Sequence, residues 1–546
     1  MTFVPSHVRA LGLLAMLLSP ACVGAQEPAA GEVAAPQDTN AIREAAFAAE
    51  RRGDHSAAAD AFLRLAKLEP SDPEWIVRAG DDLGRAGRIE EALDLLAQAR
   101  GRFPDALAIP TMLARSYALM ADSLRMRSGR DVSVQFYYED AVRTADEVLA
   151  IDPSSIDALV VRASSLLELG RAEEATTAAR AAVAKDPAKY TTQALLGRIV
   201  FERFLSLRRT IDAGQAADPA EAKAALDAHK KDAESAFRAA AALDSSRGYP
   251  LASLGDLAAW SGDQKTALGH YRDALATDPF AKVNHGWVRT AYTIAERESL
   301  YKDAVERYRA LDRATPKGVA TLLWYLGQLA FDRASEKDVD AKQRTELFKS
   351  AAEYFEATTE ALPDYVDTGW WIVQARYWQG DVAAATRAAT DFSAKAPRRF
   401  ADMIRDDEAT LAILAGMAAA EYEAGRLAAS RDLNQVIAYA RDTADDWNNY
   451  AFLCRETRAY AESLIGYERA LEKEPQSPQL LNDAAVILHY HLANEKNLAR
   501  AKEMYEQALV HAKTQLESGE LKGDARQRVV IAQRDARNNL AALNRR

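Results

Sequence analysis

The sequence predicts an all-α fold: a solenoid of about twelve helix–turn–helix units with a helix capping its C-terminal end. Two observations support this prediction. Alanine, the strongest helix former, makes up roughly a fifth of the 546 residues, against only 26 glycines and 18 prolines. In addition, half of the prolines recur in a register of 34 residues, which indicates a repeated helical hairpin. An all-β fold is therefore excluded, and a doubly wound sheet is disfavoured.

The first 25 residues have the three parts of a secretory signal peptide. Arg9 lies in a short region without acidic residues, Leu11 to Leu18 form an apolar stretch, and a small-residue cleavage site ends at Ala25. The apolar stretch is far shorter than the roughly 20 residues that a membrane-spanning helix needs. We therefore expect export to the periplasm or the extracellular space, a flexible leader at residues 26–38, and no transmembrane segment.

The two cysteines bear on membrane attachment and on redox chemistry. Cys22 offers an alternative to simple secretion, because a cysteine near a cleavage site can become a lipidated N-terminus that anchors the protein. Pro20, however, departs from the small or aliphatic residue that such a site carries. Cleavage after Ala25 leaves only Cys454, so no intramolecular disulfide is possible. Cys454 falls at a predicted core position, where we expect a buried, unreactive side chain.

The net charge argues against a nucleic-acid partner. The chain has 69 Lys and Arg against 80 Asp and Glu, a formal charge of -11. Removing residues 1–25 also removes Arg9, which leaves 68 against 80 and a mature charge of -12. Proteins that bind the phosphate backbone present a basic face. We expect no nucleic acid among the ligands.

The recurrent prolines mark the ends of helical hairpins. Three of the gaps between them are 34 residues (70 to 104, 153 to 187 and 363 to 397), and the others fit one or two such periods with insertions. Each proline follows a helical run, and proline favours the start of the next helix. The prolines in this register are Pro70, Pro104, Pro153, Pro187, Pro279, Pro316, Pro363, Pro397 and Pro475.

Three residue types recur at fixed distances before these prolines. Seventeen residues before, a glycine can take the left-handed conformation that ends the first helix: Gly53, Gly87, Gly170, Gly262 and Gly380. Eight residues before, a ring or another side chain fills the gap to the next unit: Phe62, Leu96, Tyr271, Tyr308, Phe355 and Tyr467. Twelve residues before, a small residue lets the two helices cross closely: Ala58, Ala92, Ala141, Ala175, Ala267, Ala304, Ala351, Ala385 and Ser463.

This pattern resembles the tetratricopeptide repeat (TPR) family, most clearly in segments 73–106, 248–281 and 443–477. The last segment matches the family's motif with Trp447, Tyr450, Ala451, Tyr460, Tyr467, Ala470 and Pro475. The resemblance implies that the units stack into a right-handed superhelix whose concave side is lined by the first helix of each unit. With the signal peptide, it suggests an exported bacterial TPR protein.

The repeat register gives the expected domain organisation. We place an N-terminal array at 39–281, a C-terminal array at 282–515 and a capping helix at 516–546. Insertions fall near 122–136, 208–232 and 334–346, and units ten and eleven have Ser430 and Ser463 in place of the crossing alanine. The units are 39–72, 73–106, 107–155, 156–189, 190–247, 248–281, 282–318, 319–365, 366–399, 411–443, 444–477 and 478–515. One side of the cap is expected to carry Val529, Val530, Ile531, Leu540 and Leu543.

The sequence has none of the common catalytic motifs. It lacks a GxSxG motif, an HExxH motif, a phosphate-binding glycine loop and a zinc-type cysteine pair. His489 and His491 are two residues apart, so on a helix they point about 200° from each other and are expected to be one core and one surface residue. We therefore expect no enzyme activity, no cofactor and no metal site.

A group of aromatic and amide residues marks the expected partner-binding face. In the TPR family, positions 2, 5, 9, 12 and 13 of each unit point to the concave side. On units six, eight and nine, this places Trp260, Trp324, Gln328, Phe331, Trp370, Gln374, Tyr377 and Trp378 there, with Asp332 and Asp367 beside them. Rings with nearby amides suit an extended peptide. Alternatively, some rings pack between repeats, the interpretation we prefer for Trp371.

Some TPR proteins clamp the terminal carboxylate of a chaperone peptide with lysine and asparagine residues on successive first helices. The corresponding positions here are Asp445, Asn449, Gln479 and Asp483. Because the lysines are missing, this clamp is not expected.

The sequence therefore predicts a non-catalytic scaffold of the cell envelope that binds a protein or peptide in the groove of a TPR solenoid. A glycan- or small-ligand-binding protein that uses the aromatic group of units eight and nine is the main alternative. An enzyme whose chemistry lies outside recognisable motifs is a second.

Overall fold

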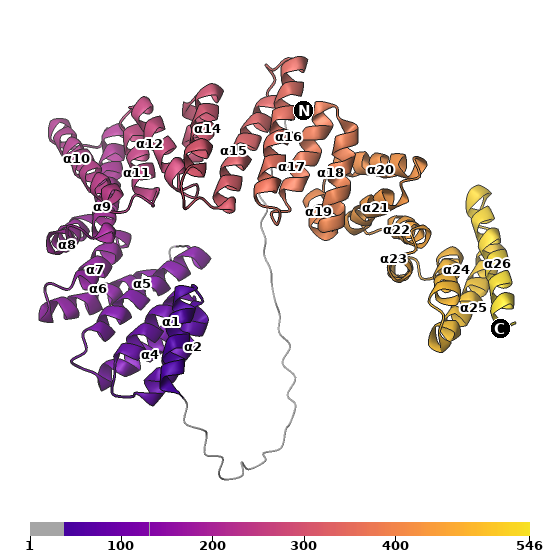
Figure 1. The fold of residues 1–546 in the computed structure, drawn as a ribbon, viewed down its shortest axis with the longest axis horizontal. Helices are drawn as coiled ribbons and strands as arrows, with labels where there is room; N and C mark the ends of the chain where they lie inside the picture. The colour runs from indigo at the N-terminus through magenta and orange to yellow at the C-terminus, as the bar shows by residue number, and fades with distance from the viewer. Residues whose placement is uncertain (1–37, 130, 546) are drawn as a thin grey trace, which may run out of the picture. The chain divides into compact units, whose positions relative to one another are not determined.

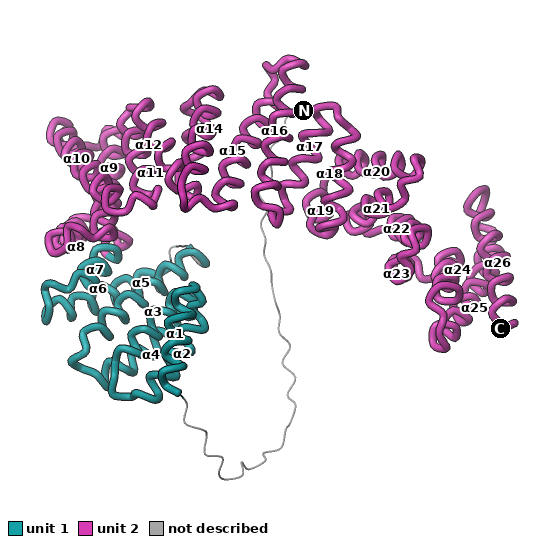
Figure 2. The backbone as a smooth tube through the Cα atoms, in the orientation of Figure 1, with its two compact units in different colours: residues 1–165 teal, residues 166–546 magenta. Residues whose placement is uncertain are grey.

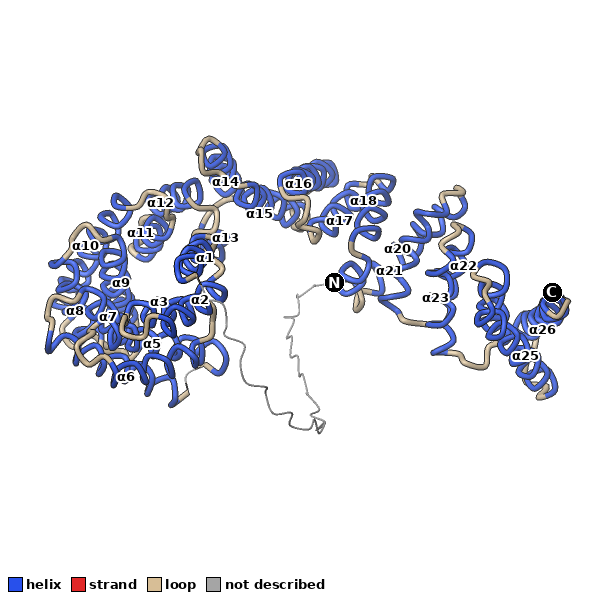
Figure 3. Tube along the Cα trace, turned by 60° about the horizontal axis from the view of Figure 1, so that its bottom comes forward, coloured by secondary structure: helices blue, strands red, loops and turns tan. Residues whose placement is uncertain are grey.

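The computed structural model describes residues 38–129 and 131–545 (Figure 1). Helices and short connections alternate along these residues (Figure 3), and none of them forms a β-strand, which confirms the predicted all-α class. The predicted signal peptide, Cys22 and residues 26–37 of the predicted leader lie outside the described ranges. A search of the described helices finds none long and apolar enough to cross a membrane.

The chain divides into two compact units, residues 1–165 and 166–546 (Figure 2). The boundary expected between two arrays at 281/282 lies inside the second unit, and that division stays a prediction. In the first unit, successive helices pair as hairpins, and the start of α7 (Ile156–Glu168) follows them. The hairpins are α1 (Thr39–Arg51) with α2 (His55–Leu68), α3 (Glu74–Arg85) with α4 (Ile89–Arg102), and α5 (Ala108–Ser128) with α6 (Val132–Ile151).

The second unit continues the same pairing. After the end of α7 and α8 (Ala172–Lys185), its first hairpins are α9 (Tyr190–Asp212) with α10 (Pro219–Leu243) and α11 (Tyr249–Trp260) with α12 (Gln264–Thr277). The short helix α13 (His285–Ala291) comes before α14 (Ile294–Arg309), which packs on α12 and α15. Then α15 (Pro316–Ala334) pairs with α16 (Ala341–Ala361). Next come α17 (Thr368–Gln379) with α18 (Val382–Lys395), a short α19 (Pro397–Ile404), α20 (Glu408–Glu423) with α21 (Leu427–Arg441), and α22 (Ala444–Glu456) with α23 (Tyr460–Lys473). The last elements are α24 (Pro478–Val486), the π-helix η1 (Ile487–His491), α25 (Glu495–Glu517) and α26 (Gly523–Leu543).

The three predicted insertions lengthen helices rather than forming long loops. Ordinary helices of the array, such as α3 and α4, have 12 and 14 residues. The helices around the insertions have 21 and 20 residues in α5 and α6, 23 and 25 in α9 and α10, and 19 and 21 in α15 and α16. Each insertion therefore extends both helices of its hairpin at the turn between them.

Small residues lie at the helix crossings, as the sequence predicts. All the alanines at this position are completely buried: Ala58, Ala92, Ala141, Ala175, Ala267, Ala304, Ala351 and Ala385. The serines at this position in units ten and eleven bring a buried hydroxyl group, and each hydroxyl forms a hydrogen bond. The Ser430 hydroxyl donates to the Ala418 carbonyl at 2.8 Å, and the Ser463 hydroxyl donates to the Ala451 carbonyl at 2.8 Å. Each serine thus bonds to the facing helix and leaves no buried group unsatisfied.

The turn glycines take the predicted left-handed conformation. Gly53, Gly87, Gly170, Gly262 and Gly380 have φ between 75° and 93°. In unit eleven this position is Arg458, which has φ 62°. A side chain with a Cβ is strained in this region of backbone conformation. The eleventh turn therefore has a local cost that the glycine-containing turns avoid.

Arg458→Gly is expected to raise the free energy of unfolding of the α22–α23 hairpin by about 1 kcal/mol, because glycine removes that strain. Hydrogen exchange of the amides in these two helices would measure the change. Arg537→Gly, in the middle of α26, is the control and should instead destabilise its helix by about 1 kcal/mol. A loss of protection in Arg458→Gly would show that the turn is not strained.

The structure corrects the repeat boundaries between units seven and ten. The seventh unit has a first helix of only seven residues, α13, and the eighth begins at Pro316 rather than at residue 319. The sequence predicts no element between units nine and ten, yet Pro397 starts the additional helix α19. The tenth unit then begins at Glu408 rather than at residue 411. Tertiary packing decides these boundaries, since Phe400, Ala401 and Ile404 of α19 are fully buried in the hydrophobic core that α17 to α21 form together.

The C-terminal helix caps the last hairpin with a narrower apolar face than predicted. Ala532 and Ala536 of α26 are buried, and Leu540 and Leu543 pack against the core of units eleven and twelve. Ile531 is 39% exposed, so it does not share this face. Consecutive helical residues point about 100° apart, which prevents residues 529–531 from lying together.

Cys454 and the histidine pair behave as predicted. Cys454 is completely buried, and burial raises the pKa of its thiol to about 11, which confirms an unreactive core position. His489 is buried, whereas His491 is exposed and stacks on Tyr460. The two rings therefore do not converge on a metal.

Candidate functional site

The eight predicted partner-binding residues lie on three first helices of the second unit. Trp260 ends α11, and α15 carries Trp324, Gln328 and Phe331. The remaining four lie on α17: Trp370, Gln374, Tyr377 and Trp378. The structure assigns them different roles, because several of their rings pack between neighbouring helices.

The rings of α15 contribute mainly to packing against α16 and α17. The Phe331 ring meets Trp371 edge to face at 5.4 Å and Phe348 at 5.2 Å, measured between ring centroids. Trp371 also stacks on Phe355 at 5.9 Å, which confirms the packing role preferred for Trp371. Trp324 and Phe331 both lie against the buried cluster that contains Phe355. Phe331 is therefore an interior contact between repeats.

The additional helix α19 covers part of the aromatic surface predicted on α17. The Trp370 ring lies 5.7 Å from the fully buried ring of Phe400. Trp370 and Tyr377 both pack against the hydrophobic core formed by α17 to α21. The sequence alone could not place α19 here, so it could not indicate that Trp370 is half-buried.

Two tryptophans of the predicted group have large exposed areas. Trp378 is 56% exposed and touches Tyr377 edge to face, and Trp260 is 38% exposed and stacks on Trp287 at 6.2 Å. Gln328 and Gln374 are half-buried. The structure thus keeps Trp260 and Trp378 at the surface but does not join all eight residues into one ring cluster.

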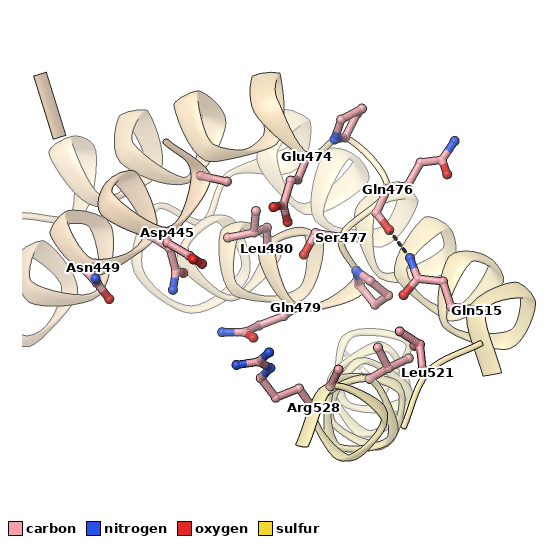
Figure 4. A pocket seen from close by; sticks show the side chains of 16 residues that line it. Asp445, Asn449, Glu474, Gln476, Ser477, Gln479, Leu480, Gln515, Leu521 and Arg528 are labelled. Atoms are coloured by element: carbon pink, nitrogen blue, oxygen red, sulfur yellow. Dashed lines mark hydrogen bonds between the residues drawn. The ribbon is translucent and has the colours of Figure 1, made fainter. Parts of the chain in front are cut away.

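A large polar pocket lies at the C-terminal end of the second unit (Figure 4). Its volume is about 860 Å³, and it is formed by α22, the connection between α23 and α24, α24, and the end of α25 with α26. Its polar lining is Asp445, Asn448, Asn449, Glu474, Gln476, Ser477, Gln479, Gln515 and Arg528.

Helix spacing brings the α22 residues of this pocket together. Thr443 caps α22 by accepting a hydrogen bond from the Asp446 amide at 3.2 Å, which fixes where the helix begins. Asn448 and Asn449 then lie three and four residues after Asp445, on the same side of the helix. From α26, the side chain of Arg528 points toward Gln479 of α24 (Figure 4).

Several polar side chains of the pocket have no hydrogen-bond partner in the rest of the described chain. Gln515 donates to the Gln476 carbonyl at 3.0 Å, so this amide is already occupied. In contrast, within the described ranges the side chains of Asp445, Asn449 and Arg528 form no hydrogen bond or ion pair with another residue. Free charges and an amide therefore face one another across an open pocket.

Asp483, the fourth position of the family's clamp, belongs to the interior. Burial raises the pKa of its carboxyl group, and the Asn482 amide, which donates to it at 3.1 Å, partly offsets this effect, as do Arg455 and the Gln479 amide. A carboxyl held by a neighbouring amide is not available to a ligand. Asp445, Asn449 and Gln479 therefore line the pocket, whereas Asp483 does not.

The sequence analysis did not predict this pocket or the contribution of the cap to it. Asp445, Asn449 and Gln479 stand at positions of the family's carboxylate clamp, which the sequence did not predict here, and Arg528 lies about 50 residues beyond Gln479 along the chain. The one sequence feature that points to Arg528 is its neighbour Val529, which was predicted on the apolar side of the cap. Both residues line the pocket.

A second pocket, of about 420 Å³, lies between α16, α17 and α18. Its main charges already satisfy each other, because Arg376 donates from Nη2 to both carboxylate oxygens of Glu356 at 2.6 and 2.7 Å. A bidentate pair of this kind leaves little to offer a ligand. Across the described residues, no group of three or more histidine, cysteine, aspartate or glutamate side chains could hold a metal ion.

Comparison with known proteins finds similarity to solved structures only. No family model and no curated protein matches the sequence. Among solved structures, a tetratricopeptide repeat protein from Parabacteroides merdae ATCC 43184 is 12% identical and covers 62% of this chain and 99% of its own, with a TM-score of 0.31. A thermophilic TPR protein of Thermus thermophilus, TTC0263, is 15% identical over 48% of this chain and 99% of its own, with a TM-score of 0.24.

A third solved structure is MamA from Desulfovibrio magneticus RS-1, which is 18% identical and covers 44% of this chain and 96% of its own, with a TM-score of 0.24. The fold itself rests on the described helices of this chain. Paired antiparallel helices, left-handed glycine turns and buried small residues at the crossings recur from α1 to α23. These features give the chain the fold of the tetratricopeptide-repeat family.

Proposed function

We propose that this protein is a non-catalytic scaffold that binds another protein, and that the C-terminal pocket holds an extended segment of that partner. The amide-rich lining of the pocket is the observation that carries the proposal. Asn448, Asn449 and Gln479 each offer a donor and an acceptor, which match the N–H and C=O groups of an extended peptide. A volume of about 860 Å³ is large enough for a short segment of chain.

The charges in the pocket support a peptide over a small apolar ligand. Asp445 and Glu474 contribute two carboxylates, and Arg528 contributes one guanidinium. A peptide with a basic side chain near α22 and an acidic side chain near α26 would neutralise these groups. An apolar ligand would bury them without partners, at a cost in free energy.

Capture from an envelope extract with the mature chain would test this proposal. We expect a specific partner protein whose binding weakens by at least about tenfold in the variant Asn449→Ala with Arg528→Ala, since each change removes one polar contact. Arg526→Ala is the matched control, because Arg526 is exposed on the same helix but does not line the pocket. Unchanged capture by the double variant would contradict the proposed site.

We also propose export to the cell envelope, on the basis of the signal-peptide features of residues 1–25. Mass spectrometry of the N-terminus of the natural protein tests this proposal directly. A chain that starts at Gln26 supports secretion to the periplasm or beyond, whereas a lipidated Cys22 supports membrane attachment. An intact Met1 would contradict export.

Trp378 and Trp260 are proposed to extend the partner-binding surface, since both rings are exposed on first helices. Trp378→Ala is a better probe than Trp370→Ala, because Trp370 packs on Phe400 and its loss would disturb the core. An exposed ring also suits a sugar. Binding on a glycan array without any captured protein would favour the alternative of a glycan-binding protein.

A further inference from the structure

The C-terminal pocket holds its carboxylates and its guanidinium group in different places. Asp445 lies in the first turn of α22, and Glu474 directly follows α23. Both carboxylates lie beside Leu480 (Figure 4). Arg528, the basic residue of the pocket, lies on the side of α26 and forms no ion pair with either of them. The part of the pocket around Leu480 is therefore negatively charged.

The basic residues that precede these two carboxylates in the chain already have other partners. Lys473 forms an ion pair with Asp442, and Arg441 lies 3.8 Å from Asp446. Within the described residues, the two carboxylates of the pocket form no hydrogen bond or ion pair of their own. They are open to the pocket and have no cation from the chain to neutralise them.

The groups around these carboxylates suit a guanidinium better than a compact cation. The acceptors come from separate elements, and the hydroxyl of Ser477 lies beside them (Figure 4). A guanidinium spreads five N–H donors over a plane and can therefore bond to acceptors on several sides, whereas an ammonium group presents its donors from one nitrogen. Pro475 and Leu480 provide apolar surface for the aliphatic part of an arginine side chain.

We propose that the segment bound in this pocket carries an arginine, and that Asp445 and Glu474 bind its guanidinium group. The inference rests on the proposed function, because it identifies one side chain of the partner segment. A divalent metal ion fits less well, since metals such as calcium take six or more oxygen ligands. Among the described residues, no third histidine, cysteine, aspartate or glutamate completes a metal site with these two carboxylates.

The test uses the full mature chain and a labelled, capped pentapeptide with arginine at its centre and alanine elsewhere. The matched peptide has citrulline at the centre, which keeps the shape of arginine but carries no charge. Fluorescence anisotropy is expected to show at least about tenfold tighter binding of the arginine peptide, because only arginine forms charge-assisted hydrogen bonds to carboxylates. Equal binding of the two peptides would overturn the proposal.

Variants of the two carboxylates locate the binding. Asp445→Asn with Glu474→Gln should weaken binding of the arginine peptide at least about tenfold and leave that of the citrulline peptide within about twofold. A variant that simply misfolds would weaken both peptides alike, so the difference between them reports the site itself. An unchanged preference for arginine in this variant would overturn the proposal.

A second pair of substitutions controls for the acidic charge of the whole chain. Glu503→Gln with Glu506→Gln removes the same charge at two exposed positions of α25 that do not line the pocket. Binding of the arginine peptide should stay within about twofold, since exposed charges at a distance are screened by salt. A loss equal to that of the pocket variant would show general attraction and would overturn the proposal.

A lysine peptide distinguishes a guanidinium site from a site for any cation. We expect it to bind at least about threefold more weakly than the arginine peptide, because its donors diverge from a single nitrogen. Equal or tighter binding of the lysine peptide would overturn the assignment of arginine.

These outcomes are distinct from those of the proposed function. If the arginine peptide fails to bind while the pocket still captures a partner protein, only the assignment of arginine is wrong. If the arginine peptide binds through the two carboxylates but no protein is captured, the scaffold function is wrong.

Discussion

Phe355→Ala is expected to lower the free energy of unfolding of the α15–α17 region by about 3–5 kcal/mol, because the substitution removes a ring from the centre of the core. Phe355 is completely buried on α16 and stacks on Trp371 of α17. It also lies directly against the backbone of α15, since a Cβ added to Gly327 would come within 2.5 Å of its ring. Truncation therefore opens a cavity where three helices meet.

Hydrogen exchange resolved by segment is the appropriate measurement, because in a repeat array each unit contacts mainly its neighbours and stability is local. Protection should fall in α15, α16 and α17 and remain unchanged near α22. Phe136→Ala is the matched control, since Phe136 of α6 is 67% exposed and should cost less than about 0.5 kcal/mol. Equal effects of the two substitutions would show that the Phe355 ring is not a core contact.

Gly255→Ala is expected to destabilise the α11–α12 hairpin by about 1–3 kcal/mol, although alanine normally favours a helix over glycine. A Cβ at Gly255 would lie 2.5 Å from Cδ1 of Tyr271. The ring cannot easily move away, because it is completely buried and its hydroxyl donates to Asp256 at 2.7 Å. The added methyl group must therefore separate the two helices.

Gly269→Ala gives the opposite expectation within the same hairpin. Gly269 lies in α12 with nothing within 4 Å of an added Cβ, so alanine should stabilise the helix by about 0.5–1 kcal/mol. Thermal unfolding and segment-resolved exchange of both variants would measure the two signs. A stabilising effect of Gly255→Ala would show that the close approach of α11 to Tyr271 is not maintained in solution.

The local sequence predicts each hairpin well because its determinants are local. Gly262 ends one helix through its left-handed backbone, Ala267 allows the crossing, and Tyr271 fills the space against Gly255. These residues act within about 20 positions of one another, so their spacing is visible in a single sequence. Arg458 shows where this local prediction fails, since the turn there is left-handed although the residue is not glycine.

The candidate sites depend on contacts between residues far apart in the chain. Trp370 fitted the predicted groove by its position, but packing of the short helix α19 through Phe400 decides that it is half-buried. Arg528 joins Asp445 and Asn449 only because α26 folds back on the last hairpin.

The sequence by itself determined the all-α class, the repeated hairpin, its small-residue crossings and the three first helices that carry the predicted residues. Only the tertiary structure decided which of those residues stay exposed, where the pocket lies and which polar groups lack partners. The physical reason is the distance along the chain over which each interaction acts. Helix propensity, turn conformation and helix crossing act over a few turns of chain, whereas burial and charge pairing depend on which distant helices pack together.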